Sequence, residues 1–438
     1  MPTNTKQTEM NLTPARKIKG QITLPGDKSI SHRAALIAAL ATGATEISNF
    51  STAQDCASTL ACLRQLGVSV EVKDGVVRVA GGKNLNAAGA SLDCGNSGST
   101  MRILAGVLAG QNFNAELIGD ESLTRRPMRR IIEPLELMGA KIDSTDGKPP
   151  LKIHGSNRLV PITYRLPVAS AQVKSAILFA ALFANGRTTV IEKSPSRDHT
   201  ERLFKGFGVP VTTNDDLSIT IDGPARFNGG AITIPGDISS AAYFIAAAML
   251  LPHSELTIEG VGLNPTRAAF LSVLSSWGAA ITTSDVRDER NEPVGTINVR
   301  GGLHSVARDE DRILSGAMIP WLIDELPLLA VVGTQVRGGI QIRDAEELRL
   351  KESDRLQATA NNLRAMGAEV EEFDDGIAVS GSAELRGAAI DSYGDHRIAM
   401  AFSVAALLAQ GGTEIKNPEC VAISFPEFFG LLETLAQR

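Results

Sequence analysis

Two patterns of hydrophobic and polar positions recur along the chain. The first is a nearly continuous run of Ala, Leu and Ile that ends at a Gly-containing turn and a short strand-like segment, as in residues 171–184 followed by 188–191. A helix that is apolar on almost every side is buried on every side. The pattern therefore predicts buried helices at residues 29–41, 100–109, 171–184, 240–251, 325–332 and 398–408.

The second pattern is an amphipathic helix, a Gly and two strand-like segments joined by a turn. Residues 352–367 illustrate the helical part, in which polar and apolar positions follow helical spacing. A Gly directly after such a run is typical of a helix end. The same junction recurs at Gly67, Gly139, Gly208, Gly278 and Gly367, and residues 428–436 predict a last, truncated helix.

The alternation of the two patterns predicts a repeated α/β architecture. Six units of about 70–85 residues account for the chain, which indicates a fold built from repeats. We predict that each unit is βαβαββ, with the helix buried and the sheets outside, and that three inverted units form each of two domains. Pro-Gly-Asp occurs at 25–27 and 235–237, where the chain is expected to cross between domains. The predicted first domain is discontinuous and comprises residues 1–25 and 236–438, and the second comprises residues 26–235.

Composition and charge narrow the class of function. The 438 residues are 43% hydrophobic and 21% charged, and the net charge is −6. An acidic chain has no overall field that attracts nucleic acid or an anionic membrane, so we expect neither as a partner. Aromatic residues, at 4%, are too few for a base-stacking surface. Any anion-binding site must therefore be a local concentration of Lys and Arg.

Cysteine spacing and the N-terminal segment predict a compartment. Cys56, Cys62, Cys94 and Cys420 show no Cys-x-x-Cys spacing, which predicts reduced buried thiols rather than a metal site. Residues 1–15 are polar and lack the apolar core of a signal peptide. No apolar run approaches the roughly 20 residues of a membrane span. These features predict a soluble cytoplasmic protein.

Cations occur where an anion would bind. The turn and helix at residues 25–40 have a second copy at 235–250, but only the first copy carries Lys28, His32 and Arg33. Packing needs no cations in the first turn of an apolar helix, whereas the N–H groups and dipole of a helix start favour an anion. Further cations beside Gly, Ser or Pro at element ends are Arg102, Arg126, Lys351, Arg355 and Arg397, and Arg197 and Arg267 lie in equivalent loops. We interpret them as an anion-binding set that would line one cleft if equivalent rims of both domains face each other.

Two carboxylates and a Gly-rich stretch add candidate chemistry. Asp324 is either the N-cap of the short helix that follows it or an acid/base group. Glu352 is either a first-turn partner of a helix dipole or an acid/base group. Residues 95–100 are small enough for backbone N–H groups to approach an anion. No metal is expected, because no third ligand stands at a suitable spacing from either Asp-His pair, Asp198-His199 or Asp395-His396.

Short motifs along nearly the whole chain carry a family resemblance. In order they are LPGDKSISHRA, GNSGSTMR, SLTRRPM, ASAQVKSA, SRDHTER, LKESDRL and DHRIAMAF. Together they resemble the 5-enolpyruvylshikimate-3-phosphate synthase family from about residue 24 to residue 429. The resemblance implies two domains of three inverted α/β units with the active site in the interdomain cleft. It also implies transfer of the enolpyruvyl group of phosphoenolpyruvate to the 5-hydroxyl of shikimate 3-phosphate, with release of phosphate and without a cofactor, in aromatic amino acid biosynthesis.

The resemblance assigns roles to individual residues. Phosphoenolpyruvate would be bound by Lys28, Arg126, Arg355, Arg397 and the backbone of Gly98. Shikimate 3-phosphate would be held by Ser29, Arg33, Ser170, Arg197 and Lys351, with Gln172 between the two ligands. Asp324 would bind the attacking hydroxyl and accept its proton, and Glu352 would protonate the methylene carbon with help from Lys28. Addition would form a tetrahedral ketal, and elimination would expel phosphate.

The chain departs from the family pattern at two places. Ile423 stands where many members carry a Lys, so one phosphate contact is absent or replaced. Residues 99–103 read Ser-Thr-Met-Arg-Ile where many members have Thr-Ala-Met-Arg-Pro. These differences resemble the more divergent branch, which is often less sensitive to glyphosate, although Gly98 is the residue of sensitive members.

We expect this chain to be a monomer. Three other readings of its function stay open. An enolpyruvyl transferase acting on UDP-N-acetylglucosamine usually has a reactive Cys in the loop that corresponds to residues 120–130, where this chain has none. An RNA 3′-phosphate cyclase would need a basic surface and an ATP site. A non-catalytic anion-binding protein would not need both Asp324 and Glu352.

Overall fold

The chain forms two compact units that are not continuous in sequence. The structure is a computed structural model that describes residues 9–82, 85–303 and 308–438. The central unit comprises Pro25–Pro235 and Asp288–Pro293, and the terminal unit comprises the residues up to Leu24, Gly236–Arg287 and Val294–Arg438. Each unit has its own hydrophobic core.

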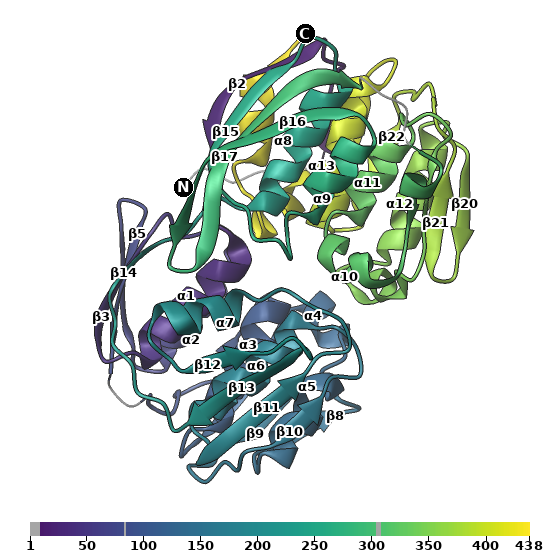
Figure 1. Ribbon diagram of the computed structural model, residues 1–438. Coiled ribbons are helices and arrows are strands. Elements are labelled where there is room, and N and C mark those ends of the chain that lie inside the picture. Colours follow the sequence, from purple (N-terminus) through teal and green to yellow (C-terminus); the bar gives the residue numbers. More distant parts are fainter. Residues whose placement is uncertain (1–8, 83–84, 304–307) are drawn as a thin grey trace, which may run out of the picture. The chain divides into compact units, whose positions relative to one another are not determined.

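The central unit contains three four-stranded sheets, in the orders β14-β3-β5-β4, β6-β7-β9-β8 and β10-β11-β13-β12 (Figure 1). In each sheet the first two strands are parallel and the other pairs are antiparallel. The strands are β3 (Gly43–Ser48), β4 (Ser69–Lys73), β5 (Val76–Gly81), β6 (Leu92–Asp93), β7 (Asn114–Ile118), β8 (Lys141–Thr145), β9 (Lys148–His154), β10 (Thr163–Arg165), β11 (Gly186–Ile191), β12 (Val211–Thr213), β13 (Ser218–Gly223) and β14 (Ala231–Thr233). The helices are α1 (Lys28–Leu40), α2 (Gln54–Gln65), α3 (Gly98–Ala109), α4 (Glu121–Arg125), α5 (Arg129–Leu137), α6 (Ala171–Ala181) and α7 (His199–Gly206).

The apolar helices of the central unit are buried, as their sequence predicts. From its third residue on, α6 is buried along its whole length, while exposed and buried residues alternate along β9. That alternation is expected of a strand with one face on the core. Helices α3 and α6 approach closely because residue 106 is Gly: a Cβ there would lie 2.1 Å from the Ala176 carbonyl oxygen. Helices therefore occupy the interior, and the sheets lie outside.

The terminal unit repeats this organisation with sheets of five, four and three strands, in the orders β16-β17-β15-β2-β24, β18-β19-β21-β20 and β1-β23-β22. The strands are β1 (Glu9–Leu12), β2 (Lys17–Thr23), β15 (Glu255–Gly262), β16 (Ala279–Glu289), β17 (Glu292–Leu303), β18 (Ile313–Leu314), β19 (Ile340–Ile342), β20 (Val370–Phe373), β21 (Gly376–Val379), β22 (Ala389–Asp391), β23 (Thr413–Lys416) and β24 (Ala436–Gln437). The helices are α8 (Ile238–Leu250), α9 (Ala269–Ser276), α10 (Ile319–Leu322), α11 (Leu326–Gly333), α12 (Arg355–Ala365), α13 (His396–Leu408) and α14 (Phe428–Leu435), with 3₁₀ turns η1 (Glu310–Arg312), η2 (Gly316–Met318), η3 (Glu346–Leu350) and η4 (Pro418–Ile423).

The N-terminal strands join sheets that are built mainly from the second half of the sequence. β2 pairs in parallel with β15, and β1 pairs antiparallel with β23. The predicted α/β class and the predicted buried helices are confirmed.

No single helix within the described residues is long and apolar enough to cross a membrane. One bent pair, Gly316–Leu322 with Leu326–Gly333, passes the test of length and composition together. Its second helix, α11, is buried along its whole length inside the terminal unit. Core packing therefore explains that helix's apolar character.

Candidate functional site

The residues predicted for the site fall into two groups, one in each unit. The central unit carries Lys28, Ser29, Arg33, Gly98, Arg126, Ser170, Gln172 and Arg197. The terminal unit carries Asp324, Lys351, Glu352, Arg355 and Arg397. Most of them lie at or just before the start of a helix.

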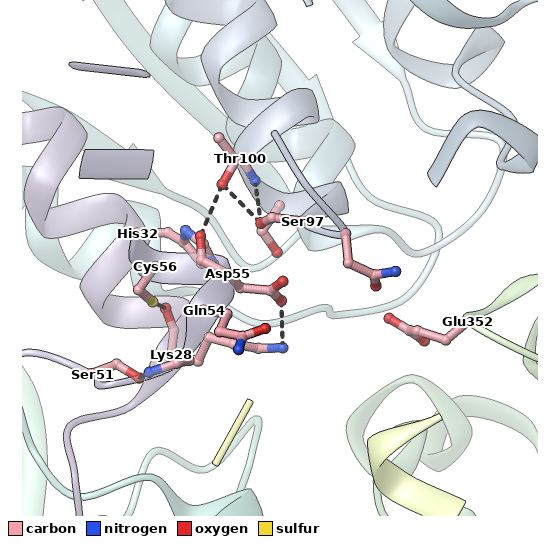
Figure 2. A network of polar contacts seen from close by, with 12 residues as sticks. Lys28, His32, Ser51, Gln54, Asp55, Cys56, Ser97, Thr100 and Glu352 are labelled. Atoms are coloured by element: carbon pink, nitrogen blue, oxygen red, sulfur yellow. Dashed lines mark hydrogen bonds and ion pairs between the residues drawn. The ribbon is translucent and has the colours of Figure 1, made fainter. Parts of the chain in front are cut away.

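Lys28 is the first residue of α1, as the sequence pattern predicts. The Asp27 carboxylate caps this helix by accepting a hydrogen bond of 2.9 Å from the Ile30 amide. The Lys28 ammonium donates to the Asp55 carboxylate at 2.8 Å (Figure 2). Asp55 is buried in the first turn of α2, and the sequence analysis missed it. The ion pair directs the Lys28 side chain and partly compensates its charge.

A chain of hydroxyl groups ties the starts of α1, α2 and α3 together. The Thr100 and Thr59 hydroxyls are 2.7 Å apart. Thr100 also donates to the Ser97 hydroxyl at 2.8 Å (Figure 2). His32 Nδ1 lies 2.7 Å from the Thr59 hydroxyl. Burial and the neighbouring charges of Lys28 and Arg33 hold the pKa of His32 well below its ordinary value. His32 is therefore a neutral member of this network rather than one of the anion-binding cations.

Gly98 begins α3 beside two arginines. Arg102 donates to the Gln172 side-chain oxygen at 2.7 Å, and the Gln172 amide donates to the Ser99 hydroxyl at 2.8 Å. Arg126 donates to the Asn96 side-chain oxygen at 2.8 Å. The structure thus brings Gly98, Arg126 and Gln172 together with Arg102, which the sequence pattern places in the anion-binding set, and adds the side chain of Asn96.

On the role that the family resemblance implies for Gly98, its replacement by Ala is expected to raise the KM for phosphoenolpyruvate by about tenfold, the loss of roughly one charge-assisted hydrogen bond. A Cβ at residue 98 would lie 2.6 Å from Arg102 Nη1 and 3.3 Å from Arg126 Nη1, so both side chains must move. Steady-state kinetics with each substrate varied in turn will measure the change. Gly89→Ala is the control, because a Cβ there meets no atom within 4 Å. Equal phosphoenolpyruvate KM values in the two variants would contradict the prediction.

Arg33 is much less accessible than the sequence pattern indicates. It is 3% exposed, and it donates to the Thr200 hydroxyl at 2.7 Å and to the Ser175 hydroxyl at 2.8 Å. It also donates to the Ser29 carbonyl oxygen at 2.8 Å. Through these contacts Arg33 connects α1 with α6 and α7, and it remains a candidate residue for binding an anionic ligand.

Ser170 and Arg197 flank a buried ionic cluster of Lys174, Glu192 and Glu201. Ser170 is the N-cap of α6, and Arg197 lies in the loop between β11 and α7. The Lys174 ammonium lies 2.9 Å from Glu192 and 2.7 Å from Glu201. Burial alone would lower the pKa of Lys174, but the two carboxylates outweigh burial and raise it. Lys174 lies on α6, Glu192 directly follows β11, and Glu201 lies on α7. The cluster therefore connects both sides of the loop that carries Arg197 to α6, the helix that Ser170 caps.

The predicted residues of the terminal unit form one ionic cluster. Arg355 donates to Asp395 at 2.8 Å and to Glu352 at 2.5 Å, and its Nη1 lies 3.6 Å from the Asp324 carboxylate. Arg397 Nη2 lies 3.3 Å from the same carboxylate. Burial opposes the charge of Arg355, but Asp395 and Glu352 outweigh it and raise its pKa. Two fixed arginines therefore hold two candidate acid/base carboxylates.

The structure overturns the N-cap reading of Asp324 and the first-turn reading of Glu352. Helix α12 begins at Arg355 and is capped by Asp354, whose carboxylate accepts from the Gln357 amide at 3.0 Å. Glu352 precedes that helix, so the predicted helix over 352–367 started too early. Glu325 occupies the cap position of α11, and Asp324 lies one residue before it.

The remaining predicted residues have identifiable partners. Lys351 lies 3.1 Å from Glu347. Asp395, which pairs with Arg355, also caps α13, and Asp198 pairs with Arg202 at 2.8 Å. The carboxylates of both Asp-His pairs are thus engaged with arginines. Over the described residues, no three His, Cys, Asp or Glu side chains are grouped to hold a metal ion.

Comparison with known proteins identifies the family. The chain matches the model of EPSP synthase (3-phosphoshikimate 1-carboxyvinyltransferase) over residues 12–432. A 3-phosphoshikimate 1-carboxyvinyltransferase from Koribacter versatilis (strain Ellin345) is 52% identical over 432 residues, which cover 98% of this chain and 99% of that protein. One from Thermoanaerobacter sp. (strain X514) is 47% identical over 422 residues, covering 96% and 98%. The structure of EPSP synthase from Acinetobacter baumannii matches 98% of each chain with a TM-score of 0.86 and 40% identity. The chain therefore belongs to the EPSP synthase family.

Proposed function

We propose that this chain is a transferase that moves the enolpyruvyl group of phosphoenolpyruvate to the 5-hydroxyl of shikimate 3-phosphate and releases phosphate. The observation that carries the proposal is the cluster in which Arg355 and Arg397 hold Asp324 and Glu352. It combines cations for an anionic substrate with carboxylates for proton transfer. Membership of the EPSP synthase family supports the same reaction.

Each substrate is assigned its own set of cations and polar groups. Phosphoenolpyruvate is assigned to Lys28, Arg126, Arg355, Arg397 and the Gly98 backbone. Shikimate 3-phosphate is assigned to Ser29, Arg33, Ser170, Arg197 and Lys351, with Gln172 shared. Arginine suits both ligands, because its planar fork donates two parallel hydrogen bonds to a phosphate or carboxylate. The assignment requires residues of both units to act on one pair of substrates.

The reaction follows as addition and then elimination. Glu352 gives a proton to the methylene carbon of phosphoenolpyruvate, with Lys28 assisting, and the neighbouring carbon becomes electrophilic. The 5-hydroxyl oxygen attacks that carbon while Asp324 accepts the hydroxyl proton. The product is a tetrahedral ketal that carries both the phosphate and the shikimate oxygen. Loss of a methyl proton back to a carboxylate then restores the double bond and expels phosphate.

No cofactor, metal, nucleic acid or membrane enters this proposal, and a cytoplasmic monomer remains the prediction. Two competing functions can be separated by substrate. A UDP-N-acetylglucosamine enolpyruvyl transferase would release phosphate with that nucleotide sugar, although residues 120–130 contain no Cys. A non-catalytic anion-binding protein would release phosphate with neither acceptor.

Phosphate release tests the function directly. The purified chain is mixed with phosphoenolpyruvate alone, with added shikimate 3-phosphate, or with added UDP-N-acetylglucosamine, and inorganic phosphate is followed over time. We expect release only in the second mixture. Release in the third mixture alone, or in none, would refute the proposal.

Lys28→Ala is expected to weaken phosphoenolpyruvate binding by about tenfold or more, the equivalent of one charge-assisted contact of roughly 1.5–3 kcal/mol, and to lower turnover as well. Its side chain is partly accessible at the start of α1, so the fold should survive. Titration calorimetry measures the binding, phosphate release measures the turnover, and circular dichroism checks the fold. Lys19→Ala is the control, because Lys19 forms an exposed ion pair with Glu255 on the outer strands. Wild-type turnover in Lys28→Ala would remove Lys28 from the site.

A further inference from the structure

A second buried carboxylate adjoins the proposed acid/base pair. Glu325 follows Asp324 directly and is 2% exposed. Its Oε1 accepts a hydrogen bond from the Ser239 hydroxyl and lies 3.6 Å from Arg397 Nη1. Its Oε2 has no hydrogen-bond partner among the described residues. Burial raises the pKa of Glu325, while Arg397 and Arg267 oppose that rise.

Ser239 connects Glu325 to a further buried arginine. It is the second residue of α8, and its hydroxyl accepts from Arg267 Nη2 at 2.5 Å while donating to Glu325. Arg267 also lies 3.5 Å from Asp237, the residue that caps α8. One hydroxyl group thus uses both its donor and its acceptor capacity. The result is a continuous chain of contacts from Arg267 through Ser239 and Glu325 to Arg397.

This chain of contacts corrects the interpretation of Arg267. The position of Arg267 in the sequence predicts an anion-binding cation, but the side chain is 2% exposed and contacts Ser239 and Asp237 at the start of α8. Helix α8 follows the second Pro-Gly-Asp turn, so Ser239 stands where Ser29 stands in the first copy. In the second copy this Ser contacts a carboxylate of its own unit.

The distances show why the Ser239 hydroxyl matters to Arg397. The Asp324 carbonyl oxygen accepts from Arg397 Nη1 at 2.8 Å, whereas Glu325 stays 3.6 Å from the same nitrogen. A direct ion pair between two buried groups would be shorter, at about 2.7–2.9 Å. The Ser239 hydroxyl, which Arg267 holds in place, therefore engages the Glu325 oxygen that would otherwise close on Arg397.

We propose that Ser239 is a positioning residue for phosphoenolpyruvate binding, because it holds the Glu325 carboxylate back from Arg397 and leaves the charge of Arg397 available to the substrate. The inference rests on the proposed function, in which Arg397 binds phosphoenolpyruvate. When Ser239 loses its hydroxyl, Glu325 pairs directly with Arg397 and competes with the substrate anion. The effect should be confined to phosphoenolpyruvate, since shikimate 3-phosphate is assigned to other residues.

Four variants of the full chain test this proposal: Ser239→Ala, Glu325→Gln, the double variant that combines them, and Arg397→Gln. We expect Ser239→Ala to raise the KM for phosphoenolpyruvate by about tenfold and to leave the KM for shikimate 3-phosphate within about twofold of wild type. Glu325→Gln keeps the shape and removes the competing charge, so its phosphoenolpyruvate KM should equal or fall below that of wild type. In the double variant the KM should return to within about threefold of wild type, because residue 325 no longer carries a carboxylate that could close on Arg397.

The double variant separates this role from a merely structural one. Loss of packing at Ser239 would not be rescued by a second substitution at Glu325, so a double variant that keeps the raised KM overturns the proposal. An unchanged KM in Ser239→Ala, or a tenfold rise in Glu325→Gln alone, also overturns it. The Glu325→Gln result decides by itself if Ser239→Ala does not fold.

A matched control and the Arg397→Gln variant complete the design. Ser403→Ala is the matched control, since Ser403 is also a buried helical serine, but its hydroxyl donates only within α13, to the Ala399 carbonyl oxygen at 2.8 Å. Its KM values should match wild type. If Arg397→Gln leaves the phosphoenolpyruvate KM unchanged, the ligand role of Arg397 in the proposed function fails. If Arg397→Gln raises that KM and Ser239→Ala does not, only the role of Ser239 fails.

Discussion

Glu352→Gln and Asp324→Asn are each expected to lower turnover by about 10²–10⁴-fold, the usual contribution of general acid–base catalysis. Both substitutions keep the size of the side chain and remove a carboxylate that lies against Arg355. Because proton transfer acts in the transition state, turnover should fall more than substrate binding weakens. Single-turnover kinetics and equilibrium binding of each substrate will separate the two effects.

Solvent deuterium distinguishes the two carboxylates. If Glu352 supplies the methylene proton, Glu352→Gln should incorporate solvent deuterium into the methylene carbon of phosphoenolpyruvate more slowly, relative to the rate of the addition step, than the wild type does. Asp324→Asn should retain deuterium entry but bind shikimate 3-phosphate more weakly, since Asp324 is assigned to its hydroxyl. Glu372→Gln is a control in the same unit, because that carboxylate pairs with Arg349 instead. Wild-type turnover in both test variants would defeat the acid/base assignment and leave the anion-binding residues untouched.

Lys174→Met is expected to destabilise the central unit by about 3–5 kcal/mol, the usual cost of breaking a buried ion pair from one side. Lys174 is 1% exposed, and its removal leaves the buried carboxylates of Glu192 and Glu201 without their cation. Urea unfolding followed by circular dichroism measures the loss, analysed as separate transitions if the two units unfold separately. Lys205→Met, an exposed change on α7, should stay within about 0.5 kcal/mol of wild type.

The pH dependence of Lys174→Met has a definite sign. Burial already raises the pKa of Glu192 above its ordinary value, with Lys174 acting to lower it. Removing Lys174 raises that pKa further, so the folded variant takes up a proton more readily than the unfolded chain. The loss of stability should therefore be larger at pH 8 and shrink as the pH falls toward 5. A loss that is small, or that grows on acidification, would show that the cluster does not depend on Lys174.

Local sequence patterns were sufficient to predict the α/β architecture and its buried helices. The all-round apolar runs predict buried helices, because a helix without a polar face has no side to turn toward water. Asp27, Ser97 and Ser170 stand directly before such runs and do cap their helices. These features depend on neighbours within a few residues, so they can be read from the chain itself. The motifs that carry the family resemblance are local in the same sense.

Contacts between residues that are far apart in the sequence could not be predicted in this way. Asp55 meets Lys28 over a separation of 27 residues, Asp395 meets Arg355 over 40, and Thr200 meets Arg33 over 167. The sequence shows that a cation or carboxylate is present, but its partner and its burial depend on which helix starts the fold brings together. Arg267 and Lys174 illustrate this point, because the sequence shows only that each is basic, whereas the structure makes each a buried partner of carboxylates.

The candidate site shows the same difference between features set by the local sequence and features set by long-range contacts. From sequence alone, the chain determined its α/β repeat, its buried helices, its family and the residue types available for binding anions and moving protons. Only the tertiary structure decided that α12 starts after Glu352, that Glu325 shares Arg397 with Asp324, and that Ser239 reaches Glu325. The physical reason is that helix formation is governed by local spacing, whereas an ion pair forms only where folding removes two charges from water at the same place.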